Sequence, residues 1–355
     1  MNLNLCGVIN QLGYGRATFE ITCGLVRAGV NVSLFPIGDK YDNNLLTDEI
    51  KTSFQNAKLF DKNADCIRIW HQHDMAQFVG KGKHIGFPIF ELDTFKHLEK
   101  HHLSSCDELF VCSSWAKEVC VNNGITIPIH VIPLGVDTKT FVPSVANIKT
   151  TTFLNIGKWE IRKGHDILVK AFKKAFSTDA GSTDDVLLIM CCDNPFLTVE
   201  GRMDWEKTYK NPKIRIVPRL QKHSDVARLM SMADCGVFPS RAEGWNLEAL
   251  EMLACGKKLI ITDYSAHTEF CSSDNAMLVD IDNVEPAVDN IWFRGEGNWA
   301  KIEEKQINQI ALYMRQVHAE KIANGFIAND NGVATASKFT WDDTTRKILG
   351  AICQN

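Results

Sequence analysis

Short apolar runs alternate with helical patterns along almost the whole chain, and this alternation limits the choice of fold more than any other feature. In the first half, strand-like runs lie at residues 3–9, 30–36, 66–71, 83–90, 108–113 and 129–135. Helical patterns lie between them, near residues 16–28, 47–56, 95–103 and 114–122. Strands that alternate with helices form parallel sheets covered by helices. The sequence therefore predicts an α/β fold.

A second series of the same kind follows a stretch that has no periodicity and many polar turn residues, residues 135–150. Its strand-like runs are residues 152–158, 185–192, 214–220, 235–240 and 258–263, and helical patterns lie near 164–177, 223–232 and 297–325. We therefore expect two Rossmann-like domains, residues 1–143 and 150–338, with parallel sheets that face a central cleft. A last helical pattern, at about residues 341–355, is expected to pack back on the first domain.

Composition excludes several classes of protein. The net charge of -4 gives no general attraction to nucleic acids or acidic membranes, so at most peripheral membrane contact is expected. The twelve cysteines lie mostly in apolar runs and none form a C-x-x-C pair, which is typical of reduced thiols in a cytoplasmic protein. The N-terminal residues carry no basic stretch before an apolar one, and no apolar run approaches 18 residues, so secretion and membrane spanning are not expected.

Two glutamates, Glu243 and Glu251, stand eight residues apart in the segment SRAEGWNLEALEMLACG, residues 240–256. Asn246 is a good N-cap and Gly256 stands where a helix commonly ends, so Glu251 falls on the apolar face of a short helix. A buried carboxylate needs a cation, a changed pKa or hydrogen bonds from a ligand. A structural glutamate that is satisfied by the backbone or by an arginine is the alternative.

A glycine-containing turn follows the first strand-like run. Gly13 and Gly15 allow the backbone to approach a ligand closely, and the next helix directs its N-terminus toward anionic groups. A dinucleotide fingerprint requires a third glycine at position 18, where the chain has Thr18, so a nicotinamide oxidoreductase is disfavoured. A tight turn without a ligand is the alternative for this segment.

A second junction between a strand and a helix carries cations. Lys158, Arg162 and Lys163 stand between the run that ends at Gly157 and the helix that starts after Gly164. Such a cluster suits a diphosphate, which carries about two negative charges. Solvated surface charges are the alternative. The free backbone N–H groups at the start of the 240–256 helix form a further anion site on the same edge of the sheet.

These segments resemble the retaining glycosyltransferases of family four, which have the two-domain GT-B fold. The resemblance is strongest for SRAEGWNLEALEMLACGKKLIITDYSAHTE, which is similar to the Glu-x7-Glu block of the family, and for NIGKWEIRKGHDILVKAF, which is similar to its diphosphate loop. CDELFVCSSWAKEVCVNNGI, IHVIPLGVDTKTF, GYGR and GFPIFELDTF are similar to segments of the acceptor domain. The resemblance covers nearly the whole chain.

The resemblance implies a role for each matching residue. Glu251 would accept hydrogen bonds from the donor ribose, and Glu243 would face the transferred sugar. The remaining donor-binding residues that it implies, together with those of the two junctions, are Gly13, Gly15, Lys158, Arg162, Lys163, Leu220, Trp245, Asn246 and Leu247.

The chain departs from the family at three points. Lys158 stands where the family usually has arginine, and Asn246 stands where glycine is common. The catalytic histidine that many members carry after the fourth strand is not evident. Glu91 or Asp93 would take its place as an acceptor-side catalytic group.

The resulting hypothesis is a hexosyl- or pentosyltransferase that moves a sugar from a nucleotide-diphosphate donor to a hydroxyl of a saccharide, a lipid-linked acceptor or a small molecule. No D-x-D cluster stands in a metal-ligand context, so neither a metal nor another cofactor is expected. Two alternatives stay open: a DNA-binding or DNA-modifying protein that acts on hydroxylated bases, and an inactive nucleotide-sugar sensor. His71 and His73 could touch an acceptor or a metal, although a solvated loop pair is the simpler interpretation.

Overall fold

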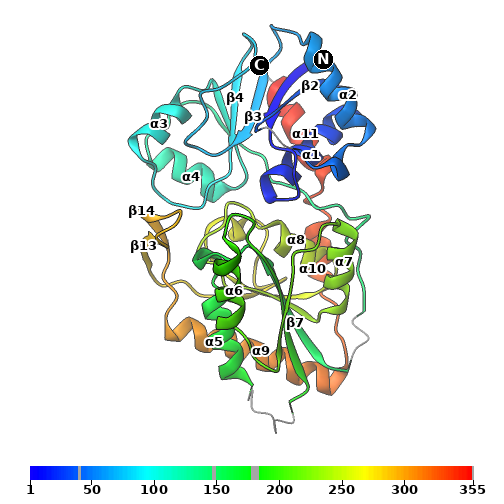
Figure 1. Ribbon diagram of the computed structural model, residues 1–355, viewed down its shortest axis with the longest axis vertical. Coiled ribbons are helices and arrows are strands. Elements are labelled where there is room, and N and C mark those ends of the chain that lie inside the picture. The colour runs from blue at the N-terminus through cyan, green and yellow to red at the C-terminus, as the bar shows by residue number, and fades with distance from the viewer. Residues whose placement is uncertain (39–40, 146–148, 177–183, 354–355) are drawn as a thin grey trace. The chain divides into compact units, whose positions relative to one another are not determined.

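The computed structural model describes residues 1–38, 41–145, 149–176 and 184–353. The chain divides into two compact units, shown in Figure 1. The first unit consists of Met1–Gly135 and Phe339–Asn355, and the second consists of Val136–Lys338.

The first unit is built on a six-stranded sheet in which all paired strands are parallel. Its order is β2-β1-β3-β4-β5-β6, with β1 (Asn2–Gly7), β2 (Asn31–Pro36), β3 (Cys66–Trp70), β4 (His84–Pro88), β5 (Glu108–Val111) and β6 (Ile129–Val131). Its helices are α1 (Gly13–Arg27), α2 (Asp48–Asn56), α3 (His97–Ser104), α4 (Ser114–Asn122) and α11 (Trp341–Cys353). All four residues of β5 are buried, as expected of a parallel strand that is covered on both faces.

The last helix of the chain, α11, belongs to the first unit. Figure 1 shows α11 in red beside α1 in blue, and the two helices approach so closely at Gly24 that a Cβ there would overlap the hydroxyl of Thr345. The hydroxyl of Thr344 donates a hydrogen bond to the carbonyl oxygen of Pro133 at 2.8 Å. The sequence placed a helix at about residues 341–355 against this domain; residues 354–355 lie outside the described ranges.

The second unit contains a second six-stranded parallel sheet. Its order is β12-β11-β10-β7-β8-β9, with β7 (Thr151–Gly157), β8 (Val186–Cys192), β9 (Ile214–Val217), β10 (Cys235–Phe238), β11 (Lys258–Thr262) and β12 (Met277–Val279). An antiparallel hairpin joins β13 (Val284–Val288) to β14 (Arg294–Ala300). The helices are α5 (His165–Ala175), α6 (Val199–Thr208), α7 (His223–Met232), α8 (Leu247–Ala254), α9 (Glu304–Asn324) and α10 (Asp330–Ala336).

Helices α5 and α9 lie together on one face of this sheet, as Figure 1 shows in green and orange. Phe172 of α5 and Met314 of α9 are fully buried in the same core cluster as Phe153 of β7. Burial of large apolar side chains is the main favourable term in folding. The core therefore holds the end of β7, and the loop that follows it, in a fixed position.

The boundary between the two units differs from the expected one. The first domain was expected to extend to residue 143, but the division falls after Gly135. The ring of Phe141 packs edge-on against His223, with centroids 5.3 Å apart, and the backbone N–H of Ser144 donates to the carbonyl oxygen of Cys255. Residues 136–145 thus pack on the second unit because their apolar and backbone partners lie there.

Two expected helix starts were also wrong. The helical pattern at residues 297–325 was expected to be one helix, but residues 297–300 belong to β14 and α9 starts at Glu304. Pairing with β13, which includes Val284 opposite Ala300, is a tertiary contact that overrides the local pattern. The first helix begins at Gly13 rather than near residue 16, so Gly13 and Gly15 lie inside its first turn and not in a turn before it.

All twelve cysteines are free in the described structure; eleven are buried and Cys353 is exposed. None of the helices in the described ranges combines the length and the apolar character that a membrane span requires.

Candidate active site in the second unit

The segments that follow β7 and β10 meet at the carboxyl edge of the second sheet, because these two strands are neighbours. The backbone N–H of Arg241 donates to the carbonyl oxygen of Arg162 at 2.7 Å. Gly164 has a φ of 70°, and a Cβ at this position would overlap the carbonyl oxygen of Pro239. A glycine is therefore required where the two segments cross.

Glu243 is the centre of a buried ion-pair cluster. Its two carboxylate oxygens are shared: Arg162 Nη1 lies 2.6 Å from Oε2, and Lys163 Nζ lies 2.8 Å from Oε1. The hydroxyl of Ser240 donates a further hydrogen bond to Oε1 at 2.8 Å. Two of the cations expected to bind the diphosphate are thus brought together with the glutamate expected to face the sugar.

A second carboxylate, Glu160, extends this cluster. Its Oε2 accepts a hydrogen bond from Arg162 Nη2 at 2.9 Å, and its Oε1 lies 2.6 Å from Lys158 Nζ. Arg162 Nη1 also donates to the carbonyl oxygen of Ala242 at 2.7 Å. The side chains of Glu160 and Arg162 are each only 5% exposed, so neither is a solvated surface charge.

Both carboxylates stay ionised. Burial opposes the ionised form of Glu243, but the positive charges of Arg162 and Lys163 outweigh it and hold its pKa well below the usual value. The pKa of Glu160 is lowered in the same way, because Arg162 and Lys158 outweigh its burial. Burial also acts to lower the pKa of Lys163, but Glu243 and Glu248 raise it, so the lysine stays charged.

The start of α8 has an unusual backbone. Asn246, the N-cap, has a φ of 83°, and its side-chain oxygen accepts a hydrogen bond from the N–H of Ala249. This conformation favours glycine and is tolerated by asparagine, which gives a physical reason for either residue at this position. His267 lies on the other side, with Nε2 2.9 Å from Asn246 Nδ2 and Nδ1 2.9 Å from the carbonyl oxygen of Thr262.

These distances indicate the protonation state of His267. Nδ1 must carry the proton to donate to the Thr262 carbonyl, so Nε2 accepts from the amide of Asn246. Burial lowers the pKa of His267 to about 4, although the charge of Glu243 acts in the opposite direction. The neutral ring thus fixes the asparagine that starts α8.

Glu251 lies on the buried side of α8, and only 5% of it is exposed. Its Oε1 lies 3.7 Å from Nε2 of His223, the first residue of α7. Phe141 packs against the same imidazole ring. A histidine is therefore one neighbour of this carboxylate.

The other donor-side residues are spread over this edge of the second unit. Trp245 is buried and packs against Phe270, with ring centroids 5.1 Å apart. Leu220 is half-buried in the loop after the edge strand β9, and Leu247 is half-buried at the start of α8.

The remaining predicted residues lie in the first unit. Gly15 cannot carry a Cβ without overlapping the backbone of Asn10, so a tight packing contact accounts for it. Gly13 has open space where a Cβ would stand. The prediction that these glycines bind the donor stays a prediction.

Glu91 and Asp93 follow β4 and are half-buried. The side-chain oxygen of Asp93 accepts a hydrogen bond from Thr94, and its carbonyl oxygen accepts one from Asn123. Nearby in the chain, the carbonyl oxygen of Ile89 accepts a hydrogen bond from the hydroxyl of Tyr14. Their catalytic roles stay predictions as well.

His71 is half-buried and His73 is exposed, and the two rings lie against each other. The hydroxyl of Tyr14 lies 3.3 Å from Nδ1 of His71, and the ring of His71 stacks on that of His73 at 5.2 Å. Among the described residues, no group of three or more histidine, cysteine or acidic side chains is arranged to hold a metal ion.

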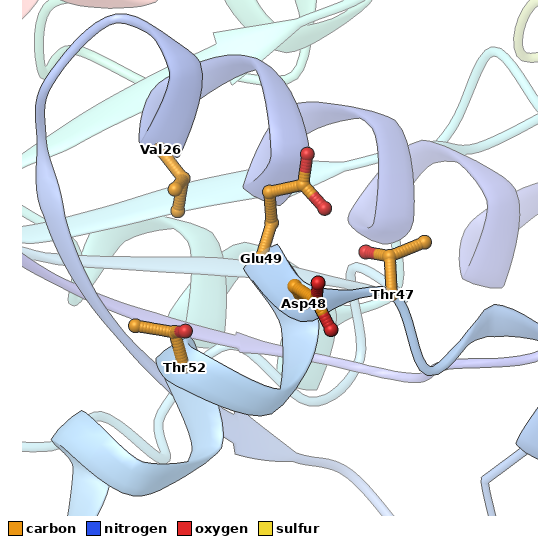
Figure 2. A pocket seen from close by; sticks show the side chains of 5 residues that line it. All are labelled: Val26, Thr47, Asp48, Glu49 and Thr52. Carbon is orange, nitrogen blue, oxygen red and sulfur yellow. The ribbon is translucent and has the colours of Figure 1, made fainter.

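An open depression of the first unit lies elsewhere, beside α1 and the first turns of α2. Figure 2 shows its lining side chains, Val26, Thr47, Asp48, Glu49 and Thr52. This lining contains two carboxylates and no cation, which does not suit an anionic donor. The Glu243 cluster remains the better candidate for a phosphate site.

Sequence reasoning missed four residues of the site. They are Glu160, Ser240, His223 and His267. The alternation of charges in the run KWEIRK could have indicated that Glu160 pairs with its neighbours. No sequence motif marks His223 or His267. Only the fold brings His223 next to Glu251 and His267 next to Asn246.

Part of the second unit matches a known protein family. Residues 150–292 match the family model described as Glycosyl transferases group 1. A GDP-mannose-dependent alpha-(1-6)-phosphatidylinositol dimannoside mannosyltransferase of Mycobacterium tuberculosis is 29% identical over 183 residues, which is 49% of this chain and 45% of that protein. The chain therefore spans about half the length of the curated relatives that it matches.

Solved structures resemble the whole chain. Sucrose-phosphate synthase from Thermosynechococcus elongatus is similar with a TM-score of 0.69 at 16% identity, over 100% of this chain and 98% of that one. Anabaena HepE in complex with UDP-glucose is similar with a TM-score of 0.70 at 14% identity, over 100% of both chains. Likeness at this level of identity shows the fold, and the expected α/β architecture with two parallel sheets is confirmed.

Proposed function

We propose that the protein is a nucleotide-sugar-dependent glycosyltransferase, because residues 150–292 match the family model of group 1 glycosyltransferases and the whole chain has the GT-B fold. It transfers a hexose or pentose from a nucleotide diphosphate to a hydroxyl of a saccharide, a lipid-linked acceptor or a small molecule. The observation that carries the proposal is the pairing of Lys163 and Arg162 with Glu243, inside the segment that the family model matches.

The diphosphate is the part of the donor that this cluster suits best. Lys158 and Lys163 are single-point cations at the edge of the sheet, and each can turn from a carboxylate oxygen to a phosphate oxygen. The backbone N–H groups at the start of α8 contribute partial positive charge, which also favours an anionic group. Glu251 accepts hydrogen bonds from the ribose hydroxyls, and Glu243 faces the transferred sugar.

The reaction places new negative charge on the departing phosphate while the sugar becomes oxocarbenium-like. Cations that are fixed before the reaction stabilise this charge without reorganisation of solvent. In the proposed mechanism they supply the stabilisation that Mg²⁺ supplies in other transferases, so no metal is required. The acceptor attacks from the face that the phosphate leaves, the phosphate takes the acceptor's proton, and the anomeric configuration is retained.

The names of the relatives indicate which nucleotide sugars to test first as donors. The curated relative is named for GDP-mannose and a similar structure holds UDP-glucose, so these two donors are the first to test.

Twelve free cysteines, eleven of them buried, support residence in a reducing compartment such as the cytoplasm. Similarity to transferases favours this function over the DNA-binding and sensor alternatives.

A panel of nucleotide sugars tests the proposal. Thermal shift selects the donor, and mass spectrometry of reactions with saccharide acceptors then detects the product, with and without EDTA. We expect one donor to raise the melting temperature and to be consumed at the same rate in EDTA. Failure of every nucleotide sugar to bind would contradict the proposed function, and loss of turnover in EDTA would contradict metal independence alone.

A further inference from the structure

The candidate site contains more carboxylate than a diphosphate site needs. Lys158, Glu160, Arg162, Glu243 and Lys163 are joined in this order by four ion pairs, and we call these five residues the charge chain. Positive and negative groups alternate along it, with three cations and two carboxylates. Each carboxylate bridges two cations, so the carboxylates occupy positions where phosphate oxygens would otherwise bind.

Arg162, the middle member, is not the part of the charge chain that meets a ligand. Its side chain is 5% exposed, and its two terminal nitrogens donate to Glu160, Glu243 and the Ala242 carbonyl. A buried guanidinium with these partners holds the two carboxylates at a fixed separation. Arg162 therefore orients Glu243 rather than the donor.

Lys158, at one end of the charge chain, is its most accessible member. Its side chain is 34% exposed, and its Nζ lies 5.7 Å from the ring centroid of Phe196, which is itself exposed. The ammonium group is nevertheless directed to Glu160, at 2.6 Å. A phosphate that recruits Lys158 must replace this contact.

Building on the proposed function, we infer that Glu160 is an internal competitor of the donor diphosphate: it holds Lys158 in the absence of nucleotide and weakens the binding of nucleoside diphosphates. Glu160 is a positioning residue. It touches neither the sugar nor the acceptor, and it acts through Lys158 and Arg162.

The balance of charge supports this inference. With both carboxylates ionised, the charge chain has a net charge of +1, because three cations face two carboxylates. Removing the charge of Glu160 leaves +2, which matches the roughly two negative charges of a diphosphate. Solvent screens the charges of buried groups only weakly, so the added positive charge strengthens the attraction of the site for the phosphate.

Competition from Glu160 also assists release of the product at the end of each turnover. The nucleoside diphosphate is a product of the transfer, and product release limits many enzymes of this kind. Return of Lys158 to Glu160 displaces the product and restores the empty site. The same residue therefore weakens the ground-state complex and speeds its dissociation.

The test is the affinity for UDP, GDP and inorganic pyrophosphate, measured by calorimetry on the full chain. Glu160→Gln preserves the shape of the side chain and still offers an oxygen to Arg162, but it removes the charge. We expect it to bind its preferred nucleoside diphosphate about tenfold more tightly than the wild type, the scale of one charge-assisted hydrogen bond. Glu304→Gln, which alters a surface pair with Lys174, is the matched control and should change nothing.

Lys158→Met tests whether Glu160 acts by holding Lys158 or only by changing the total charge of the site. This variant alone should weaken nucleotide binding, and the Glu160→Gln, Lys158→Met double variant should lose most of the tenfold gain. Steady-state kinetics give the second readout: Glu160→Gln should lower KM for the donor and also lower kcat, because product leaves slowly. A residue that only stabilises the fold would instead raise KM or leave it unchanged.

The outcomes distinguish the two levels of the proposal. If Glu160→Gln binds nucleotide equally well or more weakly than the wild type while its melting temperature stays within a few degrees, the inference is wrong. If the variant unfolds, Glu160→Asp, which keeps the charge but shortens the reach to Lys158, should still tighten binding, and weaker binding would overturn the idea. If the wild type binds neither nucleotide nor pyrophosphate, the proposed function itself is wrong.

Discussion

Each of the two units has a six-stranded parallel sheet, yet the segments that follow their first strands, β1 and β7, carry different kinds of side chain. In the first unit, the segment between β1 and α1, residues 8–12, carries no cation, and its Asn10 packs against Gly15 in the first turn of α1. In the second unit, the segment between β7 and α5 places Lys158, Arg162 and Lys163 on two buried carboxylates. The same topology thus serves a packing contact in one unit and a buried cluster of ion pairs in the other, which shows that topology provides the position and side chains provide the chemistry.

The two junctions should respond very differently to an added methyl group, and this is the largest expected effect. Gly164→Ala forces a side chain into a backbone with a φ of 70° and into the Pro239 carbonyl, so we expect a loss of about 3–5 kcal/mol of unfolding free energy. Gly13→Ala, which meets open space, should cost less than about 1 kcal/mol. Urea denaturation of both variants provides the measurement, and equal losses would remove the contrast.

The carboxylates of the two units can be compared by turnover. Glu243→Ala should lower kcat by about 10²- to 10³-fold, because it removes a charge that faces the sugar, while nucleotide affinity is kept or increased. Glu91→Gln and Asp93→Asn in the first unit provide the comparison, and kinetics with a saturating donor provide the measurement. If either substitution in the first unit lowers kcat more than Glu243→Ala does, the chemistry does not centre on the charge chain.

Acid should destabilise the second unit through two buried histidines. Burial lowers the pKa of both His165 and His267 from 6.5 to about 4. The unfolded chain takes up these protons below pH 6.5 but the folded chain does so only near pH 4, so stability is full above pH 6.5 and falls as the pH decreases toward 4. At 1.36 kcal/mol per pKa unit, each histidine contributes about 3 kcal/mol to this loss.

His267→Gln sharpens this comparison, since it removes one of the two titrating groups and retains an amide next to Asn246. We expect unfolding free energies measured between pH 4 and 7 to fall less steeply for the variant than for the wild type. An unchanged slope would show that His267 is not neutral in the folded state.

Donor affinity should show the smallest of these effects. Lys163→Ala and Glu251→Ala should each weaken nucleotide binding by about 10- to 100-fold, the scale expected for loss of a charge-assisted contact. Lys174→Ala, at the far end of α5, serves as the control because its partner is the surface residue Glu304. Unchanged affinity in both of the first two variants would remove these residues from the donor site.

Much of the fold was predictable because the relevant signals are local. Residues 235–240, for example, form a short apolar run, and every residue of the strand within it, β10, is buried. The hairpin β13–β14 was missed because most residues of β14 are polar or glycine and because its stability comes from pairing and from Trp299, which packs on Phe293 and Arg241. A pattern that depends on a distant partner leaves no periodicity to detect.

The candidate site was predictable in part. Residue type, spacing and family resemblance indicated Glu243, Glu251 and the three cations as candidates, and their roles in donor binding stay predictions. Their partners were not: the resemblance assigns Lys158 and Lys163 to the diphosphate, whereas the structure shows them on Glu160 and Glu243. A sequence shows which charges are present, but it does not show how those charges neutralise one another before a ligand arrives.

By itself the sequence determined the α/β class, the two successive strand–helix series and the chemical types available at the carboxyl edge of the second sheet, since periodicity and residue type are properties of neighbours along the chain. Only the tertiary structure decided that Arg162 pairs with a glutamate 81 positions away, that residues 136–145 pack on the second unit, and that His267 supports the start of α8. Ion pairs and buried hydrogen bonds act over a few ångströms, so they exist only after the chain has folded and their partners have left the solvent.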